Sequence, residues 1–192
     1  MRTTLSVAPT VEPITADEVK THLRIMTSDD DGYINDLIKV VRQKVEYDLR
    51  RALITQTWKM YLDDFPAGGH LIRIPYPPLQ SAGMVIKYYD AANVQQTWSS
   101  SEYEIDIYSE PARVAEVSGC TWPATYDRLN AIEITFLAGY GLTAAAVPWT
   151  VKQAMFLLCG HYYENREATT DGRPITSVPM AYENLIWTER AW

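Results

Sequence analysis

The sequence predicts an α+β protein in which three to four helices pack on a central apolar helix and an antiparallel β module is inserted between them. Residues 148–167 form a helical segment with apolar side chains on all sides. Earlier residues show a helical period, and those in between show a period of two. Because the helices on either side of the strands must share one core, we expect a mainly helical domain at 1–54 and 139–192, with the β module at 55–138.

The central segment begins at Pro148 and ends near Glu167. Residues 154–159 are all apolar, so side chains of this kind point in every direction around the helix axis. The segment is too short to cross a membrane and carries Lys152 and Glu164 near its ends. Pro148 suits the start of a helix, where its missing N–H is not needed. We therefore expect the other helices to cover this one.

The N-terminal residues predict an arm followed by a short helix. Residues 1–13 show no periodicity, and we expect an extended arm that is loose in the monomer. Thr15 and Glu18 then form a capping box, in which each side chain bonds the backbone N–H of the other residue. A helix through about Leu23 follows.

A second, longer helix is expected from the acidic segment Ser28–Asp31 to Ala52. Carboxylates are favourable at a helix N-terminus because they complement its dipole. A calcium loop is the alternative, but its ligands would have to continue to a glutamate at the twelfth position, which here is Val40. Apolar residues recur at helical spacing, and the other face carries Lys39, Arg42, Gln43, Glu46 and Arg50. The pattern predicts an amphipathic helix that packs on the central one.

From Thr55 the period changes to two, which is typical of strands. Glycines at 68 and 69 predict a turn that brings the chain back beside the first strand, and residues 90–93 predict another turn. We expect strands at 55–63, 71–74, 85–89, 94–98, 103–108, 113–117 and 131–137, at hairpin spacing.

The residues after Glu167 predict a loop, and residues 179–192 predict a short apolar helix. Two tryptophans lie close to the end of this helix, and such rings are enriched where proteins meet. The helix is therefore a candidate docking element, formed by Leu185, Ile186, Trp187 and Trp192. The alternative, that it folds back on its own domain, is equally compatible with the sequence.

Composition and charge limit the function classes. The formal net charge is −7, so the chain gains no counterion-release free energy from duplex DNA. This argues against a nucleic-acid-binding protein. It does not argue against a surface that DNA passes without adhering. The N-terminus lacks the apolar core of a signal peptide, and Cys120 and Cys159 are the only cysteines, so we expect a reducing compartment.

The sequence predicts neither an enzyme nor a cofactor or metal site. His22, His70 and His161 are scattered, and neither a nucleophile elbow nor a phosphate loop is present. Glu102, Glu104 and Asp106 share one strand face, which suits a carboxylate pair but is more typical of a solvated edge strand. Thirteen tyrosines and six tryptophans against three phenylalanines favour an assembly protein.

Four segments carry a resemblance to a known family. They are ITADEVKTHLRI, RALITQTW, IRIPYPPLQS and AGYG followed by VPWTVKQAMFLLCGHYYENRE, in the expected order across nearly the whole chain. With them the chain resembles the head–tail connector (adaptor) proteins of long-tailed bacteriophages and prophages. The last segment is the most specific of the four.

This resemblance implies a structural protein of the virion neck, made in the bacterial host cytoplasm and free of catalytic residues. Its copies would form a homo-oligomeric ring under the portal protein, which extends the channel for duplex DNA and docks neck and tail-completion proteins. No membrane is implied. We expect the two long helices to form the ring wall, the β module to contact adjacent copies and the Trp187 region to reach a portal or neck partner.

Two further functions compete with this one. Another neck component, such as a stopper or tail-completion protein, would be mainly β, so the paired long helices count against it. A small-ligand or carbohydrate-binding module would need coplanar exposed rings such as Trp58, Tyr61 and Trp98. Strand alternation, however, predicts that Trp58 and Tyr61 face opposite ways.

Overall fold

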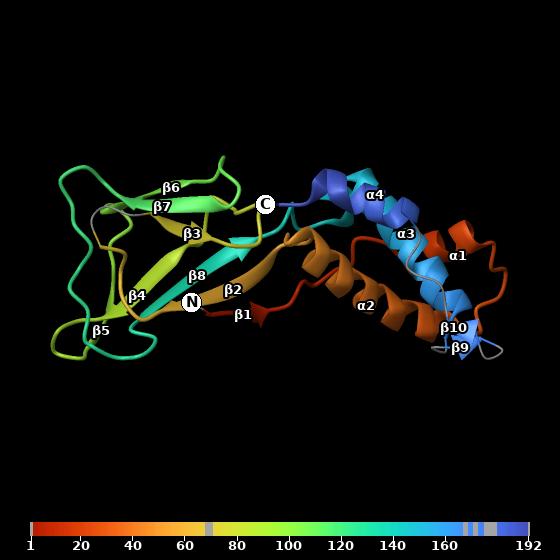
Figure 1. The fold of residues 1–192 in the computed structure, drawn as a ribbon, viewed down its shortest axis with the longest axis horizontal. Helices are drawn as coiled ribbons and strands as arrows, with labels where there is room; N and C mark the ends of the chain where they lie inside the picture. Colours follow the sequence, from red (N-terminus) through yellow and green to blue (C-terminus); the bar gives the residue numbers. More distant parts are fainter. Residues whose placement is uncertain (1, 68–70, 167–168, 171–172, 175–179, 192) are drawn as a thin grey trace. The chain divides into compact units, whose positions relative to one another are not determined.

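The computed structural model describes residues 2–67, 71–166, 169–170, 173–174 and 180–191. The chain divides into two compact units. A β unit consists of residues 2–9 and 55–139, and a helical unit consists of residues 10–54 and 140–191 (Figure 1). The predicted turn at Gly68–Gly69, His70 and Trp192 lie outside the described residues.

The helical unit is built around one helix, as the sequence predicts. Its elements are α1 (Ala16–Leu23), α2 (Asp31–Leu49), the 3₁₀ turn η1 (Ala144–Ala146), α3 (Trp149–Glu164) and α4 (Met180–Glu189). The apolar helix α3 contacts each of the other three α-helices. Six of its side chains are buried in a single core that also holds residues of α1, α2 and α4. The prediction that α3 is covered on several sides is therefore confirmed.

Local signals set where α1 begins and where α1 and α2 end. The capping box forms as predicted: Glu18 N donates to Thr15 Oγ1 at 3.2 Å, and Thr15 N donates to Glu18 Oε2 at 2.7 Å. Both helices end where the next residue, Arg24 or Arg50, takes a left-handed conformation that closes the last turn.

Two details of α2 differ from the prediction. The helix begins at the expected acidic segment, but the side chain of its N-cap residue Asp30 makes no bond to the helix amides. It accepts instead from the Tyr163 hydroxyl at 2.6 Å and from Arg166 Nη2 at 2.9 Å. Arg42, which we expected on the polar face, is buried and bonds to Glu12 at 2.7 Å and Glu46 at 2.9 Å. Helical spacing predicts on which face of a helix a residue lies, but it does not predict an ion pair with a carboxylate from another segment.

The C-terminal part of this unit contains the predicted helix and one unexpected pairing. Tyr182 and Ile186 of α4 are buried in the common core. Between α3 and α4, where the sequence predicts a loop, β9 (Thr169–Thr170) and β10 (Arg173–Pro174) form a two-residue antiparallel pair.

The β unit contains two antiparallel sheets. The strands are β1 (Arg2–Val7), β2 (Gln56–Leu62), β3 (Ile72–Ile74), β4 (Val85–Tyr89), β5 (Gln95–Thr97), β6 (Tyr103–Asp106), β7 (Ala112–Glu116) and β8 (Ile132–Ala138). One sheet has the order β1-β2-β8-β4-β5 and the other the order β3-β7-β6. Figure 1 shows the smaller sheet as a second layer beside the larger one. Each of the seven expected strands is present, with ends shifted by at most a few residues.

The pairing of these strands corrects two predictions. β2 does not pair with β3: it pairs with β8 from Gln56↔Ala138 to Leu62↔Ile132, and β3 pairs with β7. The N-terminal arm is extended but not loose, because β1 pairs with β2 and forms an edge of the larger sheet. Neither pairing is visible locally, since the partners lie far apart in the chain.

A group of stacked rings fills part of the β unit. Phe65 lies parallel to Trp122 at 4.9 Å between ring centroids, and Trp98 lies 4.8 Å from Trp122 and 5.2 Å from Tyr103. Because this unit has two sheets of its own, the description of the protein as mainly helical overstates the helices. The fold is α+β, with four α-helices and sheets of five and three strands among the described residues.

Candidate docking surfaces

The four residues predicted as a docking element have different surroundings. Ile186 is part of the helical core, and Leu185 is half-buried against it. Trp187 is 62% exposed, and Trp192 lies outside the described residues. Ile186 thus anchors α4, while Trp187 is directed away from the core.

The C-terminal end of α4 is held by hydrogen bonds to two other helical segments. Ala191 N donates to Leu49 O at 3.0 Å, and Arg51 Nε donates to Glu189 O at 2.6 Å. Thr150 Oγ1 at the start of α3 donates to Glu189 Oε1 at 2.8 Å. Trp187 therefore stands on a fixed support within the helical unit.

The outer face of α2 carries an apolar stripe that sequence reasoning missed. Tyr33, Val40 and Tyr47 are exposed, Tyr47 to 80%. Seven residues are close to two helical turns, so the three side chains lie along one line of the helix. We call them the α2 stripe. The signal that could have revealed it is a repeat of apolar residues within the polar face.

A network of rings and charges lies at one end of this stripe. The Arg166 guanidinium is 4.4 Å from the ring centroid of Tyr33 and 5.1 Å from that of Tyr163. Arg166 and the Tyr163 hydroxyl both donate to Asp30, and these bonds, the tyrosine bond foremost, hold the pKa of Asp30 below its usual range. The N-terminus of α2 is thereby fixed to the end of α3.

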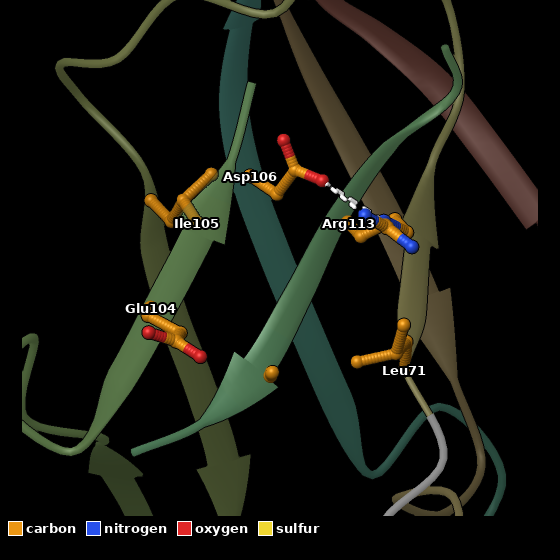
Figure 2. Close-up of a pocket in the computed structure, with 6 residues that line it drawn as sticks. Leu71, Glu104, Ile105, Asp106 and Arg113 are labelled. Carbon is orange, nitrogen blue, oxygen red and sulfur yellow. Dashed lines mark hydrogen bonds and ion pairs between the residues drawn. The ribbon is translucent and has the colours of Figure 1, made fainter. Parts of the chain in front are cut away.

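The outer face of the three-stranded sheet forms a shallow hollow of about 310 Å³. Figure 2 shows Glu104 and Asp106 on β6 and Arg113 on β7, with Leu71 just before β3. Of the three carboxylates predicted to share a strand, Glu102 lies before β6, and Asp106 is bound to Arg113. Since β6 is an edge strand, the expectation of a charged sheet edge is confirmed.

Asp106 also organises the turn between β6 and β7. Its carboxylate accepts from Tyr108 N at 2.9 Å, from Ser109 N at 3.2 Å and from Ser109 Oγ at 2.6 Å. Together with Arg113, these donors hold the pKa of Asp106 well below its usual range, the Ser109 hydroxyl contributing most. The turn presents Tyr108, which is 93% exposed.

A second hollow, of about 450 Å³, lies where β2 ends and β8 is about to begin. We call it the acidic hollow; it is lined by Asp63, Asp64, Thr125, Tyr126, Asp127, Arg128 and Leu129. Its one arginine bonds to Asn93 at 3.2 Å and lies 4.0 Å from the ring centroid of Tyr89. Among the described residues that line the hollow, three carboxylates thus share it with a single cation, which is already engaged.

The groups that could have indicated catalysis lie apart or are inaccessible. His22 stacks on Phe156 with 5.4 Å between ring centroids, and His161 lies beside Tyr162. Burial raises the pKa of the Cys159 thiol to about 12, which makes it a poor nucleophile. Among the described residues, no group of three or more histidine, cysteine, aspartate or glutamate side chains is placed to hold a metal ion.

The rings considered for a carbohydrate platform do not form one. Trp98 is buried among Phe65, Tyr103 and Trp122, and Trp58 is half-buried and stacks on Tyr76 at 4.2 Å between centroids. A stacking platform needs coplanar rings open to solvent. The arrangement counts against a carbohydrate-binding module.

Exposed apolar side chains on several elements, on a firmly packed α+β scaffold, are the features of an assembly protein. Residues 13–106 match the family model described as "Phage gp6-like head-tail connector protein". Over about half of its length the chain is thus similar to a family of phage head–tail connectors, which is structural and not enzymatic.

Solved structures share the whole fold. A chain in "Neck of empty GTA particle computed with C6 symmetry" matches with a TM-score of 0.80 and 23% identity. A chain in "Virion of native gene transfer agent (GTA) particle" matches with 0.79 and 24%, and one in "Neck of native GTA particle computed with C12 symmetry" with 0.77 and 23%. Each match covers 100% of this chain and 96% of the other.

No curated protein matches the sequence. Within the part of the chain that the structure describes, no helix combines the length and the apolar character needed to cross a bilayer.

Proposed function

We propose that the chain is a structural connector in the neck of a tailed bacteriophage, prophage or related particle, where its copies form a closed ring beneath the portal. The observation that carries this proposal is the match of residues 13–106 to the head–tail connector family. Two solved structures with the same fold are described as necks with sixfold or twelvefold symmetry. Rotational symmetry of this kind is what a ring of identical copies has.

The helical unit offers surfaces suited to such an assembly. In a ring, each copy uses two different surfaces, one for each neighbour. The α2 stripe and the exposed part of α4 are separate apolar faces on one rigid core. We assign the α2 stripe to the ring wall, because burial of its three apolar side chains against a neighbour would remove them from water.

The ring would extend the channel through which duplex DNA passes. With a formal net charge of −7, the chain repels rather than binds the phosphate backbone. This repulsion is screened by salt, with a Debye length of about 8 Å at physiological ionic strength. The channel would guide DNA without specific contacts.

The exposed Trp187 would dock a portal or neck protein, as would Trp192 beyond the described residues. Leu185 and Ile186 would support Trp187 from below, since both contact the helical core. Removal of the whole helix is not a clean test, because Tyr182 and Ile186 complete that core. The substitution Trp187→Ala should weaken portal binding by about tenfold or more, the effect of losing an aromatic anchor. Thr188→Ala, at the neighbouring exposed position, is the matched control and should bind normally.

Mass measurement of the purified chain, alone and after addition of a portal ring, tests the proposal. We expect a closed ring of copies in at least the second sample, because a portal ring can serve as the template for assembly. A chain that stays a monomer in both samples and does not bind the portal would overturn the proposal.

A further inference from the structure

We propose that the β6–β7 turn of one copy docks in the acidic hollow of the next copy, with Tyr108 as the anchor. This inference rests on the proposed ring and identifies one of the contacts that would hold its copies together. The turn and the hollow both belong to the β unit, so each copy carries both halves of the contact.

The turn is suited to insert into a partner. Tyr108 is almost fully exposed, yet its backbone is fixed by the bonds that the Asp106 carboxylate accepts from Tyr108 N and Ser109 N. A tyrosine loses little conformational entropy when it is buried, and a fixed backbone reduces that loss further. Exposed aromatic rings on such supports are frequent binding anchors.

Charges of both signs lie next to the turn: Glu104, Asp106 and Glu110 are negative, and Arg73 and Arg113 are positive. Arg73 and Arg113 are directly opposite each other on β3 and β7, and the pair Asp106↔Arg113 continues the same row onto β6. Like charges in directly opposed positions destabilise a sheet. Arg113 is compensated by Asp106, whereas the side chain of Arg73 is exposed and makes no hydrogen bond or ion pair with another described residue. An anionic partner would relieve this repulsion.

The acidic hollow offers the complementary chemistry. Asp63 accepts from Asn130 N at 2.7 Å, and Asp64 accepts from Thr125 Oγ1 at 2.7 Å, so these carboxylates are held in place. The Asp127 side chain is exposed and makes no hydrogen bond or ion pair with another described residue. Leu129, 76% exposed, provides an apolar contact for a ring. The hollow therefore suits a tyrosine accompanied by one uncompensated arginine, Arg73.

The positions of the two halves require a second copy. In Figure 1 the β6–β7 turn lies at one end of the β unit, and the loop that leads into β8, with the end of β2, lies at the other end. One chain cannot bring its own turn into its own hollow. Contacts between two different surfaces propagate head to tail and close into a ring when the rotation allows it.

A disulfide trap tests the contact directly. In a Cys120→Ser background, Tyr108→Cys is combined with Leu129→Cys, and the assembly formed with a portal ring is treated with a mild oxidant. We expect a ladder of dimers, trimers and larger species on a non-reducing gel. The matched control combines Tyr108→Cys with Leu5→Cys, an exposed residue of β1 outside the hollow, and should remain monomeric on the gel.

The outcomes separate this inference from the proposed function. Rings that form without a ladder would show that the hollow faces another protein or solvent, which overturns the inference and leaves the connector function intact. A ladder that is equally strong in the control would also overturn it. A failure of the unmodified chain to assemble, with and without the portal, would overturn both proposals.

A charge exchange provides a second test without cysteines. Arg73→Glu and Asp127→Arg should each reduce assembly of the chain on a portal ring at least tenfold, measured by sedimentation. An equimolar mixture should recover part of this loss, because the altered turn then meets the altered hollow with opposite charges. Variants that associate like the unmodified chain would contradict the assigned contact.

Discussion

The helical unit and the β unit of this protein are stabilised by contacts that span very different distances along the chain. In the helical unit, α1 is fixed by a capping box within four residues, and α3 is apolar over consecutive positions. In the β unit, β2 takes its neighbours from the N-terminus and from β8. The comparison teaches that local signals define helices one by one, whereas a sheet depends on register between distant segments.

The largest effect is expected from the centre of the larger sheet. Phe136 in β8 is fully buried, and Phe136→Ala should lower the free energy of unfolding by about 4 kcal/mol through lost burial and the cavity left behind. Chemical denaturation measures the loss. Leu129→Ala, in the same unit but exposed, should change stability by less than about 0.5 kcal/mol. Similar losses in both variants would show that β8 does not hold the sheet together.

Loss of the buried charge in α2 should rank second. Arg42→Ala removes the cation that the half-buried Glu12 and the more deeply buried Glu46 share, which should cost about 3 kcal/mol. Lys39→Ala removes a cation of the same helix whose ion pair with Asp36 is exposed, and should cost less than about 1 kcal/mol. Equal losses of stability in thermal or chemical unfolding would mean that burial does not determine how much these ion pairs stabilise the chain.

The capping box should have a smaller effect. Thr15→Ala removes the acceptor for Glu18 N and should destabilise the chain by about 1 kcal/mol. Thr21→Ala, within the same helix, should be close to neutral, because Thr21 only bonds back to Asp17 O. Hydrogen exchange of the α1 amides distinguishes the two. Unchanged hydrogen exchange in Thr15→Ala would show that the capping box does not determine where α1 begins.

Acid should reveal the Asp106 interactions. The folded pKa of this carboxyl lies below its ordinary value near 3.8, so its contribution to stability is complete above that value and declines as the pH falls below it. Asp106→Asn should therefore show a shallower loss of stability between about pH 4 and pH 2. Denaturant titrations at each pH measure this slope, and a slope identical to that of the unmodified chain would contradict the assigned interactions.

The smallest effect is expected from chemical modification of the two native cysteines. Cys159 is buried with a raised pKa, whereas Cys120 is half-buried. A thiol reagent at neutral pH should modify Cys120 first, and Cys159 only after unfolding. Mass spectrometry of the early product identifies the modified residue. Early modification of Cys159 would mean that the helical core opens more readily than the β unit.

These differences also explain what the sequence could predict. The four α-helices and the seven expected strands follow from periodicity and caps. The role of β1 could not be predicted, since none of its side chains is buried and its partner β2 lies far along the chain. The burial of Arg42 depends on Glu12, a residue outside its own helix.

The docking surfaces were only partly predictable. The sequence predicts Trp187 as part of a docking element; the residue is exposed, and its docking role stays a prediction. The α2 stripe was hidden within a face defined by its charges. The exposure of Tyr108 depends on a turn, and the acidic hollow depends on loops that lie together. Sequence periodicity predicts neither arrangement.

Electron cryo-microscopy of the chain bound to a portal ring tests the central claim most directly. We predict a closed ring of copies beneath the portal, with the α2 stripe buried between neighbours and each β6–β7 turn in contact with the adjacent copy. Isolated copies on the portal, or the absence of any bound chain, would contradict the account.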